Sequence, residues 1–145
     1  MFRNILVVEH SLQRSDKPFL AAVEFSKLHR SSIVDLSIVE PRLYNGSDEQ
    51  ARHDGALVER ERRLVARHVL DDHVTAARQA QLACKAFIVQ SQTPSVEILN
   101  VARSEGCDVI FIAAQKRQGF FVKLLEESEM DWVIQHAQVP VLVFP

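Results

Sequence analysis

The chain has 145 residues, of which 47% are hydrophobic and 25% are charged, and it carries a net charge of −2 with a pI of about 6.3. These values are typical of a globular protein that buries its own core, so we expect one domain over residues 1–145. The near-neutral charge argues against dedicated nucleic-acid binding. No apolar run reaches the ~18 residues of a membrane span, which predicts a cytoplasmic protein with no direct membrane insertion.

The N-terminal third predicts strand, helix and strand. Ile5–Val8 is a continuous apolar run, as in a central parallel strand covered on both faces. Ser15 is a candidate N-cap for a helix whose apolar stripe begins at Phe19 and which ends near His29. A second strand follows over residues 33–39. Its alternating pattern places Asp35 and Ser37 on one face, which we expect to lie near a sheet edge or to be partly solvated.

A long helix is predicted from Ser47 to Gln79, with a capping-box pattern formed by Ser47 and Gln50. Charged residues cover much of this segment and predict a solvated face with i,i+4 pairs. The predicted apolar stripe consists of Leu57, Leu64, Val65, Val69, Leu70 and Val74.

Two histidines on this helix, His68 and His73, are five residues apart. A metal pair on one helix face requires spacing of three or four residues, so these two side chains point in different directions. We expect both to be exposed, and we predict no metal site.

The remaining segments continue the alternation of strand and helix. The expected elements are a strand at Cys84–Val89, a helix capped by Thr93 and ending at Gly106, a strand at Asp108–Ala114, a helix at Lys123–His136 and a strand at Val139–Phe144. Alternating strands and helices predict an α/β fold: a doubly wound five-stranded parallel sheet with helices on both faces. Ligands of such sheets bind at the carboxyl ends of the strands.

Neither the cysteines nor the tryptophan requires a functional role. Cys84 and Cys107 lie in or beside apolar runs and form no CxxC pair, so we interpret them as buried hydrophobic side chains. Trp132 is expected to be a core or interface anchor, with a place in a ligand pocket as the alternative. Ser11 and His10 are only sequence neighbours, which does not give catalytic geometry. We therefore predict no enzyme and no cofactor.

The order and spacing of several segments resemble the universal stress protein family along essentially the whole chain. The similar segments are Met1–Val8, Ala21–His29, Thr93–Ala102, Gly106–Ile112 and His136–Val143. The resemblance implies a Rossmann-like fold, similar to the adenine nucleotide alpha hydrolases, and a role in stress adaptation. Asp131 and Trp132 resemble the tandem-type branch of the family.

ATP-binding members of that family carry an aspartate at the end of the first strand and a G-x2-G-x9-G-(S/T) pattern after the fourth. The matching positions here are Glu9, Ala113, Lys116, Glu126 and Glu127, with Gly119 retained between them. Two carboxylates would face the triphosphate, and like charges about 4 Å apart cost on the order of 4 kcal/mol even at an effective dielectric near 20. The resemblance thus predicts a degenerate nucleotide-binding site.

Three functions stay open at this point: a regulatory binding module, a sensor of ATP, AMP or a small anion through a remodelled loop, and an accessory subunit of a membrane transporter. If a ligand binds, the candidate residues are Glu9, His10, Val39, Ala113, Lys116, Arg117 and Gly119. Lys116 and Arg117 would then form the anion clamp.

The last strand is strongly apolar and is expected at a sheet edge, where exposed backbone groups invite pairing. The resemblance implies a two-fold homodimer that pairs Val139–Phe144 with its copy.

Overall fold

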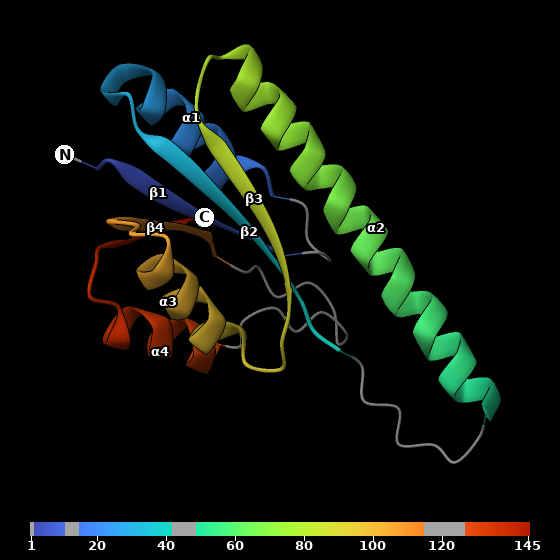
Figure 1. Cartoon of the computed structure of the whole chain (residues 1–145). Coiled ribbons are helices and arrows are strands. Elements are labelled where there is room, and N and C mark those ends of the chain that lie inside the picture. The colour runs from blue at the N-terminus through green and yellow to red at the C-terminus, as the bar shows by residue number, and fades with distance from the viewer. Residues whose placement is uncertain (1, 11–14, 42–48, 115–126) are drawn as a thin grey trace.

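The computed structural model describes residues 2–10, 15–41, 49–114 and 127–145. Strands and helices alternate through these ranges (Figure 1). The elements are β1 (Asn4–His10), α1 (Lys17–His29), β2 (Ser32–Val39), α2 (Glu49–Gln79), β3 (Cys84–Gln90), α3 (Pro94–Ser104), β4 (Val109–Ala113), α4 (Glu127–His136) and β5 (Val141–Phe144).

The strands form one parallel sheet in the order β3-β2-β1-β4-β5. The chain winds outward from β1 to β3 and then returns to continue through β4 to β5 on the other side. This confirms the doubly wound α/β fold, and it places the switch point between β1 and β4. It also confirms that the last strand lies at an edge.

Helices cover both faces of the sheet (Figure 1). On the α3–α4 face, Leu6, Leu36 and Ile110 of the strands pack with Ile98 and Val133 of the helices. The opposite face belongs to α1 and α2, and its apolar core includes Ile5, Val7, Phe19, Ala22, Val109 and Ala77. Coverage on both faces explains why the central strands are continuous apolar runs.

The C-terminal half of α2 carries the helix face that is buried against the sheet. The buried positions there, Ala66, Leu70, His73 and Ala77, are spaced by four, three and four residues and form one helical face. The predicted apolar stripe is therefore partly wrong, since Leu57, Leu64 and Val65 are 46%, 61% and 52% exposed. The cause is visible in Figure 1, where the Glu49 end of α2 extends away from the strands.

The helix ends follow the expected chemistry with small shifts. Asp16, not Ser15, occupies the N-cap of α1, and its side chain makes no capping hydrogen bond. Thr93 and Pro94 begin α3 as predicted. The turn after α3 places Gly106 at a φ of +63°, a backbone conformation that glycine adopts without strain. The predicted capping box at Ser47 and the first turn of the predicted last helix lie outside the described residues.

None of the helices in the described ranges combines the length and apolarity needed to cross a bilayer.

Candidate functional site

A polar cluster interrupts the apolar α1–α2 face of the sheet. Glu9 of β1, Asp35 of β2 and His73 of α2 are 6%, 0% and 6% exposed. The register pairs Val7 with Asp35 and Glu9 with Ser37, so the two carboxyl groups lie diagonally across adjacent strands on one face. The packed half of α2 then carries His73 over them.

The His73 ring contacts carboxylates through both nitrogens. Nδ1 lies 2.7 Å from Asp35 Oδ2 and 3.5 Å from Glu9 Oε1. Nε2 lies 3.4 Å from Oδ1 of Asp16, at the start of α1. Phe19 stacks on the imidazole with ring centroids 3.8 Å apart and an interplanar angle of 5°. The ring is thus fixed at two edges and one face.

The cluster perturbs the ionisation of its members. Burial by itself would lower the pKa of His73, but the Asp35 hydrogen bond and the charges of Asp35 and Glu9 outweigh it and raise that pKa. Burial raises the pKa of Asp35, and the His73 hydrogen bond and charge oppose this only in part. Two carboxyl groups face a single imidazole here, so the site favours positive charge.

Two predictions from the sequence are wrong at this site. Asp35 was expected near an edge or partly solvated, but β2 lies inside the sheet between β1 and β3, and α1 and α2 cover it. His73 was expected to be exposed, but the frame of Ala66, Leu70 and Ala77 turns it inward. His68 is exposed, and the two histidines do lie on different faces of α2. That frame of small and apolar residues was the signal in the sequence that could have identified His73.

The predicted ligand residues lie at the carboxyl ends of neighbouring strands. Glu9 and His10 end β1, Val39 ends β2 and Ala113 ends β4. Val39 is fully buried, and the Glu9 carboxylate is turned into the α1–α2 face. Lys116, Arg117, Gly119 and Glu126 lie outside the described residues. A ligand-binding role for this set stays a prediction.

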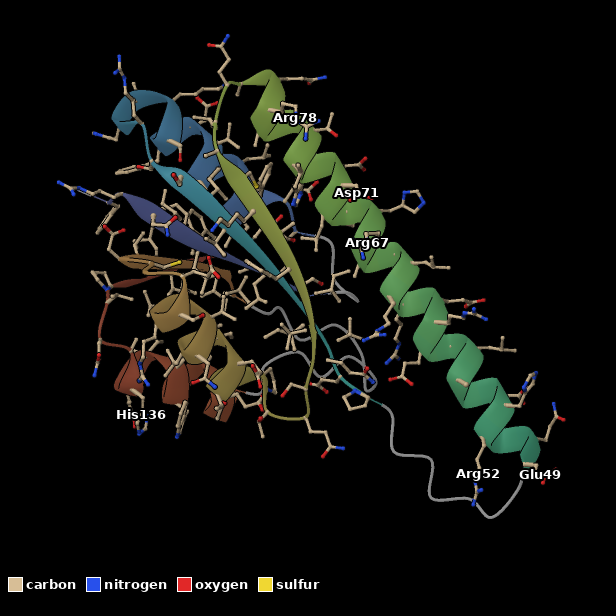
Figure 2. All side chains as sticks on the ribbon, viewed as in Figure 1. Glu49, Arg52, Arg67, Asp71, Arg78 and His136 are labelled. Carbon is tan, nitrogen blue, oxygen red and sulfur yellow. The ribbon has the colours of Figure 1, made fainter. Side chains whose placement is uncertain are left out.

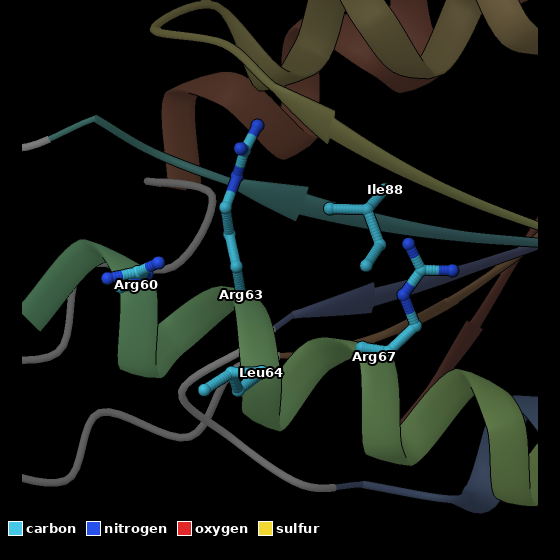
Figure 3. Close-up of a pocket in the computed structure, with 5 residues that line it drawn as sticks. All are labelled: Arg60, Arg63, Leu64, Arg67 and Ile88. Atoms are coloured by element: carbon cyan, nitrogen blue, oxygen red, sulfur yellow. The ribbon is translucent and has the colours of Figure 1, made fainter.

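A separate groove with a cavity volume of about 320 Å³ lies between α2 and β3, and is lined by Arg60, Arg63, Leu64, Arg67 and Ile88 (Figure 3). Arg63 and Arg67 flank Ile88 in this view. Within the described ranges, the three arginines form no ion pair. Other charged residues, including Asp71 and Arg78, follow along the same helix (Figure 2). The charge run that predicts a solvated helix face includes Arg60, Arg63 and Arg67, and it gives no sign of the groove.

Cys107 is buried as predicted, whereas Cys84 is only half-buried. Burial raises the pKa values of Cys84 and Cys107 to about 12, so both stay neutral thiols near neutral pH. Trp132 is 37% exposed and stacks on His136 with ring centroids 4.1 Å apart. It is therefore a surface residue rather than a core anchor, and its place in an interface stays a prediction.

Comparison with known proteins identifies the family. The family model described as "Universal stress protein family" matches residues 1–145. The chain belongs to the universal stress protein family. A search of curated protein sequences finds no significant match.

Solved structures share the fold of this universal stress protein at low sequence identity. A family member from Burkholderia pseudomallei is 24% identical with a TM-score of 0.69, and the alignment covers 98% of this chain and 95% of that one. UspA from Lactobacillus plantarum is 19% identical with a TM-score of 0.76 and coverages of 99% and 97%. The Archaeoglobus fulgidus protein in complex with dAMP is 17% identical with a TM-score of 0.65 and coverages of 100% and 98%.

Proposed function

We propose that this protein is a regulatory binding module of the stress response that does not bind ATP in the manner of its ATP-binding relatives. The observation that supports this most strongly is the position of Glu9. It replaces the aspartate of ATP-binding members, and its carboxylate is 6% exposed and 3.5 Å from His73 Nδ1. A carboxylate held in an internal charge cluster is poorly placed to contact a nucleotide.

The substituted glycine positions support the same conclusion. Ala113 and Lys116 replace two residues of the glycine pattern, and Glu126 and Glu127 replace the later Gly-Ser or Gly-Thr pair. Backbone amides approach phosphate most closely where there is no Cβ, and carboxylates repel it. The function then resides in protein contacts rather than in nucleotide turnover.

The test compares freshly purified wild-type protein with a variant that restores the pattern: Ala113→Gly, Lys116→Gly, Glu126→Gly and Glu127→Ser. Nucleotide released by denaturation is quantified by chromatography and mass spectrometry. We expect none with the wild type. Stoichiometric ATP released from the wild-type protein would contradict the proposal, whereas ATP released only from the restored variant would identify the substituted loop as the cause.

A second candidate function is binding of an anion, such as the phosphate of AMP. The groove formed by Arg60, Arg63 and Arg67 favours it, because three guanidinium groups without ion-pair partners in the described residues suit phosphate recognition. The dAMP bound to the Archaeoglobus relative makes a mononucleotide a reasonable probe. Titration with AMP should then give heat that Arg63→Gln removes and Arg78→Gln, on the same helix outside the groove, retains.

We also propose that the protein forms a homodimer through its last strand. β5 is an edge strand, and its Leu142 and Val143 are 47% and 41% exposed. Pairing of β5 with its copy about a two-fold axis would cover this edge. Light scattering at tens of micromolar should give twice the chain mass, and Leu142→Lys should give the monomer. A monomeric wild type would contradict the dimer. A cytoplasmic location and docking on a transporter stay predictions.

A further inference from the structure

The polar cluster has the composition of a metal site. Glu9, Asp35 and His73 each offer one ligand atom, and these atoms all lie within 4.8 Å of one another. They extend from β1, β2 and α2, so the donors converge from three separate elements. We propose that the cluster binds a divalent transition metal ion, with Zn²⁺ as the reference ion, through His73 Nδ1 and one oxygen each of Glu9 and Asp35.

Two of the donor separations can be compared with those around a bound ion. Zn²⁺ binds nitrogen and oxygen at about 2.1 Å, so ligands in a tetrahedral site lie about 3.4 Å apart. His73 Nδ1 is already 3.5 Å from Glu9 Oε1. Its 2.7 Å contact with Asp35 Oδ2 is a hydrogen bond that metal would replace. That contact has to lengthen by about 0.7 Å.

The other side of the imidazole is arranged as in known metal sites. A histidine that ligates metal through one nitrogen usually donates its other N–H to a carboxylate, which fixes the tautomer. Asp16 Oδ1 lies 3.4 Å from His73 Nε2 and can take that role. Phe19 fixes the plane of the ring by stacking. When the proton is on Nε2, the lone pair of Nδ1 points toward the two carboxylates and can bind an ion placed between them.

An independent observation also points to a cation at this cluster. Asp35 is fully buried, and its Oδ1 has no hydrogen-bond partner within the described part of the chain. Buried carboxylate oxygens are almost always satisfied, because an unsatisfied one forfeits its hydration. An imidazole that binds metal is neutral, so in the metal-bound form the three side chains together carry two negative charges, which a divalent cation neutralises. A bound ion would be a partner for Asp35 Oδ1 and would balance the charge of the two carboxylates.

The donor set selects the class of ion. Mg²⁺ and Ca²⁺ prefer oxygen ligands, whereas an imidazole nitrogen suits Zn²⁺ and its neighbours in the first transition series. With no thiolate in the set, soft ions such as Cu⁺ are disfavoured. A bound ion would join the packed half of α2 to β1 and β2, and it would stabilise the folded state in proportion to its concentration.

The experiment uses the full chain, dialysed first against chelator and then against chelator-free buffer. Zn²⁺ is titrated calorimetrically into wild type, Glu9→Gln, Asp35→Asn and His68→Gln, and Co²⁺ is followed by visible absorption. His68 is the matched control, since it is an exposed histidine on the same helix. We expect one Zn²⁺ per chain, at least about tenfold weaker binding in the two cluster variants and unchanged binding in His68→Gln.

Further measurements separate the site from surface binding and from misfolding. Asp16→Asn, whose side chain is 42% exposed, should weaken Zn²⁺ about tenfold while the fold is kept. Wild-type Co²⁺ protein should show the intense visible bands of a low-coordinate ion, which a hexahydrated ion lacks, and this readout does not depend on any variant folding. Absence of these bands, or equal weakening by His68→Gln, would overturn the proposal. Neither result depends on whether nucleotide binds.

Discussion

The two faces of the sheet in this universal stress protein are closed to solvent in different ways. The α3–α4 face buries an apolar core of side chains such as Leu36, Ile110 and Ile98. The α1–α2 face buries comparable residues, but it also encloses Glu9, Asp35 and His73. Buried ionisable side chains distinguish the second face, whose stability also depends on charge compensation among these three residues. Apolar packing is enough to explain the fold. It does not explain the buried polar cluster, which is therefore the better candidate for a functional role.

The largest expected effect comes from removing the imidazole between the carboxylates. His73→Ala leaves two buried carboxyl groups without their compensating partner, and such losses typically cost about 3–5 kcal/mol. Chemical denaturation in chelator should report this loss of unfolding free energy. The matched substitution His68→Ala, on the exposed face of α2, should change it by less than about 0.5 kcal/mol. Equal effects of the two would show that the cluster contributes nothing specific.

A second comparison separates the packed and extended halves of α2. Leu70 is 2% exposed, whereas Leu64 is 61% exposed. Leu70→Ala should lower the unfolding free energy by about 2–4 kcal/mol because it leaves a cavity, and Leu64→Ala should have little effect. The same denaturation series measures both. A large loss for Leu64→Ala would mean that the extended half packs against a partner, for example in a dimer.

The smallest expected effect is on the reactivity of the two cysteine thiols, one of which lies beside each apolar core. Cys84 packs against the α1–α2 core and Cys107 belongs to the α3–α4 core, and burial raises both pKa values to about 12. Only the thiolate reacts, so below that pKa each pH unit should speed alkylation about tenfold. Iodoacetamide labelling at pH 8, 9 and 10, read by mass spectrometry, measures this. A rate that levels off by pH 9 would show that at least one thiol is not held at a raised pKa.

The sequence was sufficient for the sheet but not for the cluster. Apolar runs such as Ile5–Val8, and the Thr93-Pro94 helix start, are local signals, so strands and helices could be placed from them. The burial of Asp35 depends on which strand lies beside β2, a long-range property that alternation along one strand does not contain. The sequence pattern does not reveal His73, because large residues such as Leu64 predict an apolar stripe on a different part of the helix surface. The true face is carried in part by the alanines at 66 and 77.

From the sequence, the residues that bind a ligand at the strand ends could be predicted only as a set of candidates. Glu9 could be recognised as the residue in place of the family aspartate, but its pairing with His73 joins segments 64 positions apart in the chain. No local pattern encodes such a contact. It follows from the helix crossing the sheet, and it gives Glu9 an internal partner, while a ligand-binding role for this residue stays a prediction.

We infer that Glu9 belongs to an internal charge cluster in this family member and that the protein does not bind ATP in the family manner. Isothermal titration of the dialysed wild-type protein with Mg-ATP is the decisive test. We expect no binding heat at tens of micromolar protein. A saturable, micromolar one-to-one isotherm would contradict it, and would mean that Glu9 leaves His73 or that other residues hold the triphosphate.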